Sequence, residues 1–257
     1  MNLNKVCTEK QHGTAEGDFI CLENGWNKAK EDLKGLNCEE GKTVNGVVSG
    51  VPYICENMEF HRVSSFQTWF GTSGSSKLNN NYNSDAQWLV ESDGQSHVEW
   101  PVTITDNNSE NQLNAVVQKC DGICGKAILN NSEIEYDPYV YIAFELTKKE
   151  TNVSDMGGIC IAYTSNIFSY IDMIIENTLD YPSYTLKKSP DEVNIVNIPW
   201  SSFKQSGWGE KVTPEEIFKS AIKIGFKLQH RNGTEADFNI KAIGPYMGDC
   251  DLYDVAK

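Results

Sequence analysis

The eight cysteines of this 257-residue chain could form disulfide bonds, and their spacing repeats. Two segments near the start share a frame of an aromatic residue, an isoleucine and a cysteine, followed by a second aromatic ring: Phe19 to Trp26 and Tyr53 to Phe60. Recurrence at this scale predicts duplicated modules. Each module is too small to bury a core, so each is expected to need a disulfide. Disulfides predict an oxidising compartment, and hence a secreted or cell-surface protein.

We expect four pairs, with free buried thiols as the alternative: Cys7 with Cys21, Cys38 with Cys55, Cys120 with Cys124, and Cys160 with Cys250. Eight cysteines permit many connectivities, so the pairing outside the two repeats is the weaker inference. The C-x3-C spacing of Cys120 and Cys124, with no second pair and no histidine pair nearby, does not match a zinc site. We therefore expect no metal site and no cofactor.

A second kind of chemistry is indicated by the segment from Tyr170 to Glu176. In a half-buried strand, alternate residues face opposite sides. Ile171, Met173 and Ile175 would face a core. This leaves Tyr170, Asp172 and Glu176 on the outer face. An exposed ring beside two carboxylates could stack on a sugar ring and accept hydrogen bonds from its hydroxyls. The alternative is an ordinary polar outer face, and a slip of one residue in strand phase would exchange the two faces.

Three further aromatic residues could contribute to such a surface. Trp69 lies just before a Gly/Ser-rich loop, Trp88 follows a polar loop, and Tyr184 belongs to a short strand-like run. For both tryptophans, partial burial in the core is the alternative. By contrast, we expect Trp200 and Trp208 to pack beneath a loop, and we expect Tyr163 to be a core residue.

Catalysis has no recognisable signature in this chain. The motifs G-x-S-x-G, H-E-x-x-H and G-x-G-x-x-G and the P-loop are all missing from the sequence. A glycoside hydrolase needs two carboxylates facing each other across a cleft, which a sequence cannot show. We therefore identify no catalytic residue.

The charge balance excludes some partners. A net charge of −14 disfavours binding to nucleic acid or to an anionic membrane surface. No apolar run approaches the roughly 20 residues of a membrane span, and no signal peptide follows Met1. We expect that a leader was removed. Neutral ligands such as sugars suit an acidic surface.

The sequence pattern changes near residue 61, from cysteine repeats to strand-like runs separated by turns. Residues 1–60 read as the two paired-cysteine repeats, about 5–34 and 35–60, and 61–257 as one domain. In the second part, short strand-like runs alternate with turn clusters, which is typical of an antiparallel sandwich. The expected strands are 65–70, 87–90, 98–104, 113–119, 125–130, 139–146, 158–164, 170–176, 183–186, 193–199, 222–229 and 237–243.

One helix is predicted after Thr213, because an N-cap, a proline and two acids follow one another there. A second helix-like stretch, 26–36, lies between the two repeats. The fold class predicted is all-β: a β-sandwich of jelly-roll type with one short helix, preceded by two small disulfide-stapled repeats.

Several segments carry a resemblance to a known family. The most specific is Pro199-Trp-Ser-Ser-Phe203-Lys-Gln-Ser-Gly-Trp208-Gly, and the others are 136–144, 156–165, 224–229 and 237–244. Together they resemble the galactose-binding-like jelly-roll carbohydrate-binding modules of cell-wall-degrading and adhesion proteins from rumen bacteria such as Fibrobacter. The paired-cysteine units resemble spacer repeats of the same proteins. An acidic stretch that helps hold calcium in relatives is replaced here by 56–61, so we expect no calcium site.

The resemblance implies a non-catalytic module that holds a secreted or cell-surface protein on plant cell-wall polysaccharide, either β-glucan (including cellulose) or xylan. We expect a monomer attached to a larger parent protein. Two alternatives remain: a jelly-roll hydrolase or lyase acting on polysaccharide, and a structural adhesion or assembly domain that binds protein.

Overall fold

The computed structural model describes residues 8, 15–16, 19–22, 25–28, 33, 37–45, 52–78, 80–83, 85–104, 113–130, 135–147, 152–175 and 178–254. The chain divides into two compact units. Unit 1 comprises Met1–Ser65 and Ser154–Gly158, and unit 2 comprises Phe66–Val153 and Ile159–Lys257. Within the described ranges, no helix is long and apolar enough to cross a membrane.

The described part of unit 1 forms two small antiparallel sheets. One consists of β1 (Ala15–Glu16), β2 (Phe19–Leu22) and β3 (Gly25–Lys28), and the other of β4 (Thr43–Asn45), β5 (Pro52–Glu56) and β6 (Glu59–Arg62). A helix-like stretch was expected at 26–36, but its first residues belong to the strand β3, in which Trp26 pairs with Cys21 across a hairpin.

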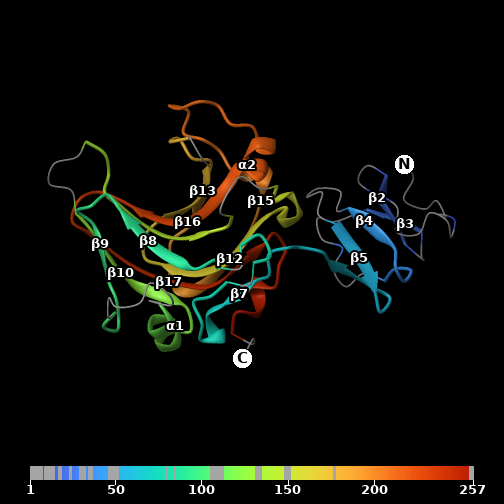
Figure 1. Cartoon of the computed structure of the whole chain (residues 1–257), viewed down its shortest axis with the longest axis horizontal. Helices are drawn as coiled ribbons and strands as arrows, with labels where there is room; N and C mark the ends of the chain where they lie inside the picture. Colours follow the sequence, from blue (N-terminus) through green and yellow to red (C-terminus); the bar gives the residue numbers. More distant parts are fainter. Residues whose placement is uncertain are drawn as a thin grey trace. The chain divides into compact units, whose positions relative to one another are not determined.

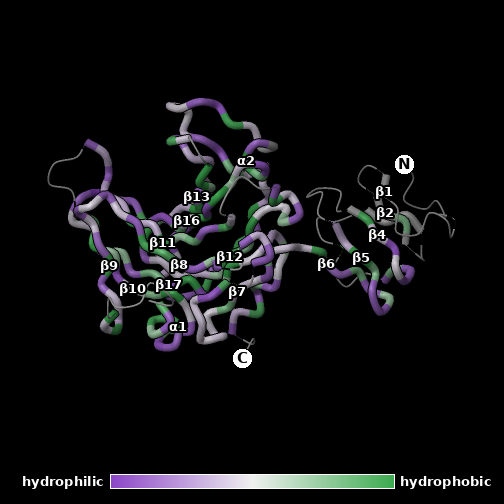
Figure 2. The backbone as a smooth tube through the Cα atoms, in the orientation of Figure 1, coloured by the Kyte–Doolittle hydropathy of each residue, from purple (hydrophilic) through white to green (hydrophobic). Residues whose placement is uncertain are grey.

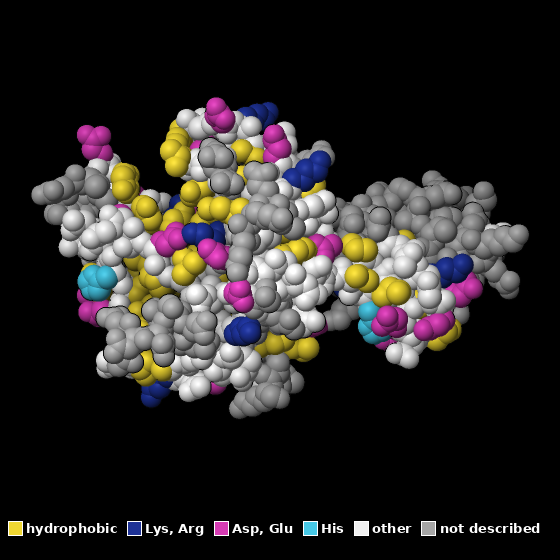
Figure 3. Space-filling view, viewed as in Figure 1, with side chains coloured by type: hydrophobic (Ala, Val, Ile, Leu, Met, Phe, Trp, Pro, Cys, Tyr) yellow, Lys and Arg dark blue, Asp and Glu magenta, His cyan; other side chains and the backbone are white. Residues whose placement is uncertain are grey.

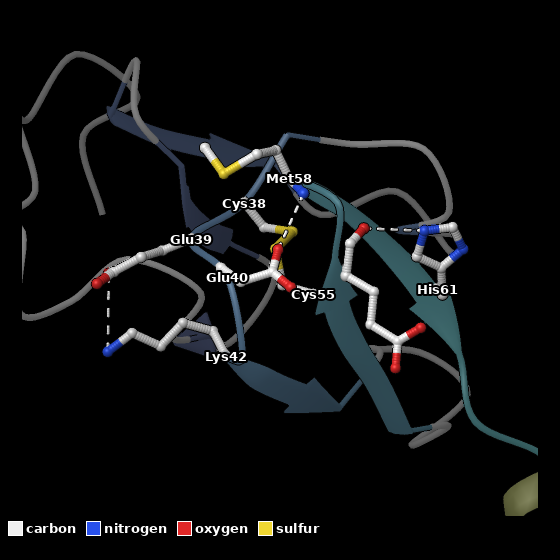
Figure 4. Close-up of a disulfide and its surroundings, with 8 residues drawn as sticks. Cys38, Glu39, Glu40, Lys42, Cys55, Met58 and His61 are labelled. Carbon is white, nitrogen blue, oxygen red and sulfur yellow. Dashed lines mark hydrogen bonds and ion pairs between the residues drawn. A yellow bond between two sulfur atoms is a disulfide. The ribbon is translucent and has the colours of Figure 1, made fainter.

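The second sheet of unit 1 is built around a disulfide. Cys38 and Cys55 are joined, and both are buried together with Tyr53 and Phe60. Figure 4 shows this bond beside the hydrogen bond from the Met58 amide to Glu40. The cluster is too small to be stable by burial alone, so the covalent link carries much of its stability.

Unit 2 is a β-sandwich of two antiparallel sheets (Figure 1). The five-stranded sheet has the order β14 (Ser183–Leu186), β13 (Ser169–Ile175), β16 (Ala221–Gln229), β11 (Tyr139–Glu145) and β8 (Trp88–Ser92). The six-stranded sheet has the order β15 (Ser189–Pro199), β12 (Gly158–Ser165), β17 (Thr234–Pro245), β10 (Ile123–Leu129) and β9 (His97–Glu99), with β7 (Trp69–Phe70) paired to β17.

The core lies between the two sheets. Phe226 of the five-stranded sheet contacts Tyr163 and Phe238 of the six-stranded sheet, at ring-centroid distances of 5.9 and 6.3 Å. Ile171 and Met173 are fully buried, as the alternation in their strand predicts. Figure 2 shows hydrophobic segments running along these strands and hydrophilic ones in many of the connecting loops. The β-sandwich predicted from the sequence is therefore confirmed.

Two short helices border the sandwich. The expected strand 113–119 is instead the helix α1 (Asn114–Cys120). Its buried side chains Leu113, Val116 and Val117 follow the spacing i, i+3, i+4, which is the helical period. The predicted helix after Thr213 is α2 (Pro214–Ser220), whose first turn is closed by a capping box between Thr213 and Glu216. Among the described residues there are four 3-10 turns: η2 (Gly71–Ser73), η3 (Ser154–Met156), η4 (Trp200–Ser202) and η5 (Cys250–Leu252).

Two disulfides lie outside the N-terminal region. Cys120 pairs with Cys124, and Cys160 pairs with Cys250, as expected from the sequence. Cys21 is also disulfide-bonded, and its expected partner Cys7 lies outside the described residues. The Cys160–Cys250 bond belongs to a buried cluster with Ala162 and Ala242, on the face of β12 and β17 that points away from the sandwich core. It fixes the C-terminal segment against the six-stranded sheet.

Candidate functional site

The outer face of the five-stranded sheet brings aromatic and charged side chains of several strands together. The strand register places Tyr170, Lys227, Tyr141 and Glu91 in one row across four strands. In Figure 3 the surface is hollowed above these strands, with hydrophobic, basic and acidic side chains on the floor of the hollow. We refer to this surface as the tyrosine face.

Tyr141 lies flat across the middle of the tyrosine face. A Cβ atom on Gly225 of β16 would come within 2.7 Å of the Tyr141 ring, so only glycine leaves room for this ring. The ring passes over β16, and its hydroxyl donates to Asp172 of β13 at 2.5 Å. Burial and the neighbouring Asp172 carboxylate raise the pKa of Tyr141, so the phenol stays protonated and continues to donate.

Asp172 is the buried anchor of the tyrosine face. It accepts from the Tyr141 hydroxyl and from the Ser183 hydroxyl at 2.6 Å, and it forms an ion pair with Lys227 at 2.9 Å. Its side chain is 2% exposed. A buried carboxylate is tolerated because it is paired and hydrogen-bonded. With three partners in place, Asp172 holds neighbouring side chains rather than presenting a free acid or base.

Lys227 joins two rings of the tyrosine face. Its ammonium nitrogen lies 5.4 Å from the centroid of Tyr170 and 5.6 Å from that of Tyr141. Both distances fall within the range of cation–π attraction, about 6 Å. The lysine stem and the Asp172 pair therefore fix the spacing of Tyr170 and Tyr141 before any ligand arrives.

A tyrosine row continues from Tyr141 toward the start of β11. Tyr139 contacts Tyr141 edge-on at 5.4 Å, and Tyr136 stacks on Tyr139 at 6.1 Å. Tyr139 is half-buried, and Tyr136 is 51% exposed. The row thus runs from Tyr141, which is 7% exposed at the centre of the sheet, to solvent, and its open ring surface lies at Tyr139 and Tyr136.

The start of this row is fixed by a carboxylate in the turn between β8 and β9. Asp93 accepts from the backbone amides of Gln95, Ser96 and Tyr139 at 2.7 to 2.9 Å. Burial alone would raise the pKa of Asp93, but these donors outweigh burial and hold it below its ordinary value. The Asp93 carboxylate therefore stays charged and positions the backbone of Tyr139.

An ion pair between β16 and β8 extends the tyrosine face toward the β8 edge of the sheet. The Lys223 ammonium lies 2.5 Å from a Glu91 oxygen. Burial raises the pKa of Tyr181, as do the charges of Glu91 and Asp172, while Lys223 lowers it. Tyr181 therefore interacts electrostatically with charged groups of the tyrosine face. The face combines flat rings with fixed donors and acceptors, which is the chemistry that a sugar ring and its hydroxyls require.

The residues predicted from the sequence fall in several places. Tyr170 lies on the tyrosine face and is half-buried, and Asp172 lies there but is buried rather than open to solvent. Glu176 lies outside the described residues. Tyr184 pairs with Ile171, so it shares the inward phase of the strand and contacts Phe203 instead.

The prediction of Trp69 and Trp88 as rim platforms is wrong. They are 4% and 6% exposed and contact each other edge-on at 5.2 Å. Trp88 also packs on Phe144, which is its register partner on β11 and faces the core. The core therefore takes both rings, which was the alternative for each.

Several residues of the tyrosine face were not predicted: Glu91, Tyr136, Tyr139, Tyr141, Lys223 and Lys227. A signal existed in the alternation of Tyr139 and Tyr141, which places both rings on one face of a strand. The order of the strands, which brings them beside Tyr170 and Lys227, is not visible in the sequence. Trp208 also differs from expectation, because it is 67% exposed.

The described residues contain no group of three or more His, Cys, Asp and Glu side chains that could hold a metal ion. No protein-family model matches the chain, and no curated protein matches it.

Among solved structures, the chain is similar to a family 11 carbohydrate-binding module of a cellulosomal cellulase of Clostridium thermocellum, with 11% identity and a TM-score of 0.37 over 62% of this chain and 87% of that chain. It is also similar to a family 61 module solved with β-1,4-galactotriose, with 12% identity and a TM-score of 0.26 over 61% and 86%. An exo-β-agarase matches with 11% identity and a TM-score of 0.34 over 73% of this chain and 26% of that chain. These similarities are too distant to assign a family or a ligand.

Proposed function

We propose that unit 2 is a non-catalytic carbohydrate-binding module whose tyrosine face holds plant cell-wall polysaccharide, either β-glucan (including cellulose) or xylan. The observation that carries the proposal is the row Tyr136, Tyr139 and Tyr141, continued by Tyr170 across Lys227. Pyranose rings pack their C–H faces on such rings, and their hydroxyls can pair with Lys223, Glu91 and the tyrosine hydroxyls.

The electrostatics support binding rather than hydrolysis. Asp172, the most buried carboxylate of the face, is saturated by two hydroxyl donors and Lys227. Glu91 is paired with Lys223. Glycoside hydrolysis needs one protonated carboxyl group and one ionised carboxylate on opposite sides of the scissile bond. Asp172 and Glu91 are engaged in holding the surface, and the tyrosine face is built before ligand arrives.

The disulfides suit an oxidising, extracellular setting. We propose that the chain is a monomer within a larger secreted or cell-surface protein of a fibre-digesting bacterium. Residues 1–60 would then serve as two spacer repeats before the module at 61–257.

The test is affinity electrophoresis of the chain in gels containing soluble β-glucans, xylans or galactans. It is combined with pull-down on insoluble cellulose and a reducing-sugar assay on the same samples. Retardation without sugar release is expected on at least one polysaccharide. Tyr139→Ala and Tyr170→Ala should each weaken retention about tenfold, a loss of ~1.4 kcal/mol.

The matched control is Tyr253→Ala, because Tyr253 is a partly buried tyrosine that packs against the opposite sheet. This variant should retain normal mobility in the polysaccharide gel. Sugar release by the wild-type chain would refute the non-catalytic assignment, and the absence of retention on every glycan would favour a protein-binding role.

A further inference from the structure

The loop before α2 is wrapped around a buried carboxylate. Asp180 is 2% exposed, and its oxygens accept from the backbone amides of Ser206, Gly207, Trp208 and Gly209 at 2.8 to 3.2 Å. Four consecutive amides aimed at one carboxylate fix the backbone of this loop. Burial alone would raise the pKa of Asp180, but the four donors outweigh it and hold the pKa below its ordinary value.

Gln205 closes the same loop from within. Its side-chain amide donates to the carbonyls of Asp180 and Glu210 at 2.9 and 2.6 Å, and its oxygen accepts from the Val212 amide at 2.7 Å. The loop is therefore held by hydrogen bonds to Asp180 and Gln205. The Trp208 side chain is not buried to hold it, since it is 67% exposed.

An exposed tryptophan on a fixed backbone needs a reason, because burial of this large side chain is favourable. Leu179, which directly precedes Asp180, is 76% exposed. The two elements joined by the Asp180 carboxylate thus each present an apolar side chain to solvent. A rigid backbone reduces the entropy that such a side chain would lose on binding a ligand.

The loop is connected to the tyrosine face. Lys204 and Ser183 exchange two backbone hydrogen bonds, at 2.9 and 3.0 Å, along the free edge of β14. The Ser183 hydroxyl donates to Asp172, the anchor of the tyrosine face. Tyr181, which interacts electrostatically with Asp172 and Glu91 of that face, directly follows Asp180. In Figure 1 the orange loop that leads into α2 stands beside β13, at the border of the five-stranded sheet.

We propose that Trp208 is a further sugar-stacking residue, which extends the tyrosine face beyond β14 and is positioned by Asp180. The inference rests on the proposed function of the tyrosine face. It specifies the ligand as an extended chain of several sugar units, because the loop lies beyond the edge strand. Trp208 then contributes only when the oligosaccharide is long enough to reach it, and it sets a preference for longer chains.

The experiment is calorimetric titration with purified oligosaccharides of increasing length, from two to six units, taken from the polysaccharide that the wild-type chain binds best. For Trp208→Ala, we expect unchanged affinity for the shortest ligands that bind and a loss of roughly fivefold for the longest. Trp208→Phe should recover part of the loss. Tyr170→Ala should lose affinity at every length.

Asp180→Asn tests the positioning role. It keeps the volume of the side chain but removes the charge that four amides share, so it should lower affinity for the longest ligands in the same direction as Trp208→Ala. It should also change the near-UV circular dichroism of the exposed tryptophan, and this change should be absent when Trp208→Ala is the background.

Three outcomes would overturn the inference, and they are distinguishable from one another. If the wild-type chain binds glycans and Trp208→Ala matches it at every length, the role of Trp208 is refuted while the tyrosine face stands. If the wild-type chain binds no glycan, the proposed function fails, and the inference fails with it. The inference would also be refuted if sedimentation showed that the wild-type chain is a dimer and that Trp208→Ala is a monomer. Trp208 would then contact a second copy of the chain.

Discussion

The hydroxyl of Tyr141 on β11 reaches across the intervening strand β16 to donate to Asp172 on β13 at 2.5 Å. This bond joins side chains of β11 and β13 above β16, on the face that points away from the core. It lies directly over Gly225, and Lys227 contacts both of its partners. The centre of the tyrosine face is therefore a connected polar network, in which the removal of any member leaves another group short of a partner.

Tyr141→Phe removes one donor from this network and preserves the ring. Asp172 keeps Ser183 and Lys227 but loses one hydrogen bond inside a nearly water-free site. We expect the free energy of unfolding to fall by about 1–3 kcal/mol, measured by urea denaturation. Ser183→Ala is the parallel variant, because it removes the other hydroxyl donor to Asp172. An unchanged denaturation midpoint in both variants would show that the network adds no stability.

Gly225→Ala should disturb the tyrosine face without adding a polar group. The new Cβ would lie 2.7 Å from the Tyr141 ring, closer than real contacts allow, so the ring must tilt. We expect a loss of about 1–3 kcal/mol in unfolding free energy and weaker retention in polysaccharide gels. The double variant Gly225→Ala with Tyr141→Ala removes the clash. Its cost should therefore be smaller than the sum of the two single costs.

The carboxylate of Asp180 makes a pH-dependent contribution to the stability of the folded chain. Its pKa is lower in the folded chain than in the unfolded one, where it is about 3.9. The stabilisation it provides is therefore fully present above that unfolded pKa, and it is lost as the pH falls through the folded value. Wild-type stability should decline more steeply than that of Asp180→Asn when thermal unfolding is followed from pH 6 toward acid. Parallel curves for the two proteins would contradict the prediction.

The sequence carries enough information for the fold because its strands alternate. Ile171 and Met173 point inward and Tyr170 and Asp172 outward, as the period of two requires. The assignment of strands from short apolar runs failed at 113–119, where a strand was expected and a helix formed. The three apolar residues there have a helical spacing. Short apolar runs allow both interpretations, and only the packing of α1 beside β10 decides between them.

The candidate site was only partly predictable. Composition indicates that a tryptophan can stack on a sugar, but it does not tell which tryptophans the core takes. Trp69 and Trp88 are needed to fill space beside Phe144, whereas Trp208 is left exposed by a loop that Asp180 holds. Both facts depend on contacts between residues far apart in the chain. Such contacts follow from strand order, which a single sequence does not reveal.

The two disulfides of unit 2 should differ strongly in their contribution to stability. Cys160 and Cys250 are 90 residues apart, while Cys120 and Cys124 are only four apart. A cross-link restricts the unfolded chain more when it closes a longer loop. Replacement of both cysteines by alanine should therefore cost about 3 kcal/mol more for the first pair than for the second.

The measurement is urea denaturation of the two double-alanine variants, followed by the near-UV signal of unit 2. The double variant Cys38→Ala with Cys55→Ala serves as a control. That disulfide belongs to unit 1, so its loss should leave the unfolding transition of unit 2 unchanged. Equal costs for the Cys160–Cys250 and Cys120–Cys124 variants would argue against restriction of the unfolded chain as the source of the difference. The local packing of Cys160 and Cys250 with Ala162 and Ala242 would then carry the stabilisation.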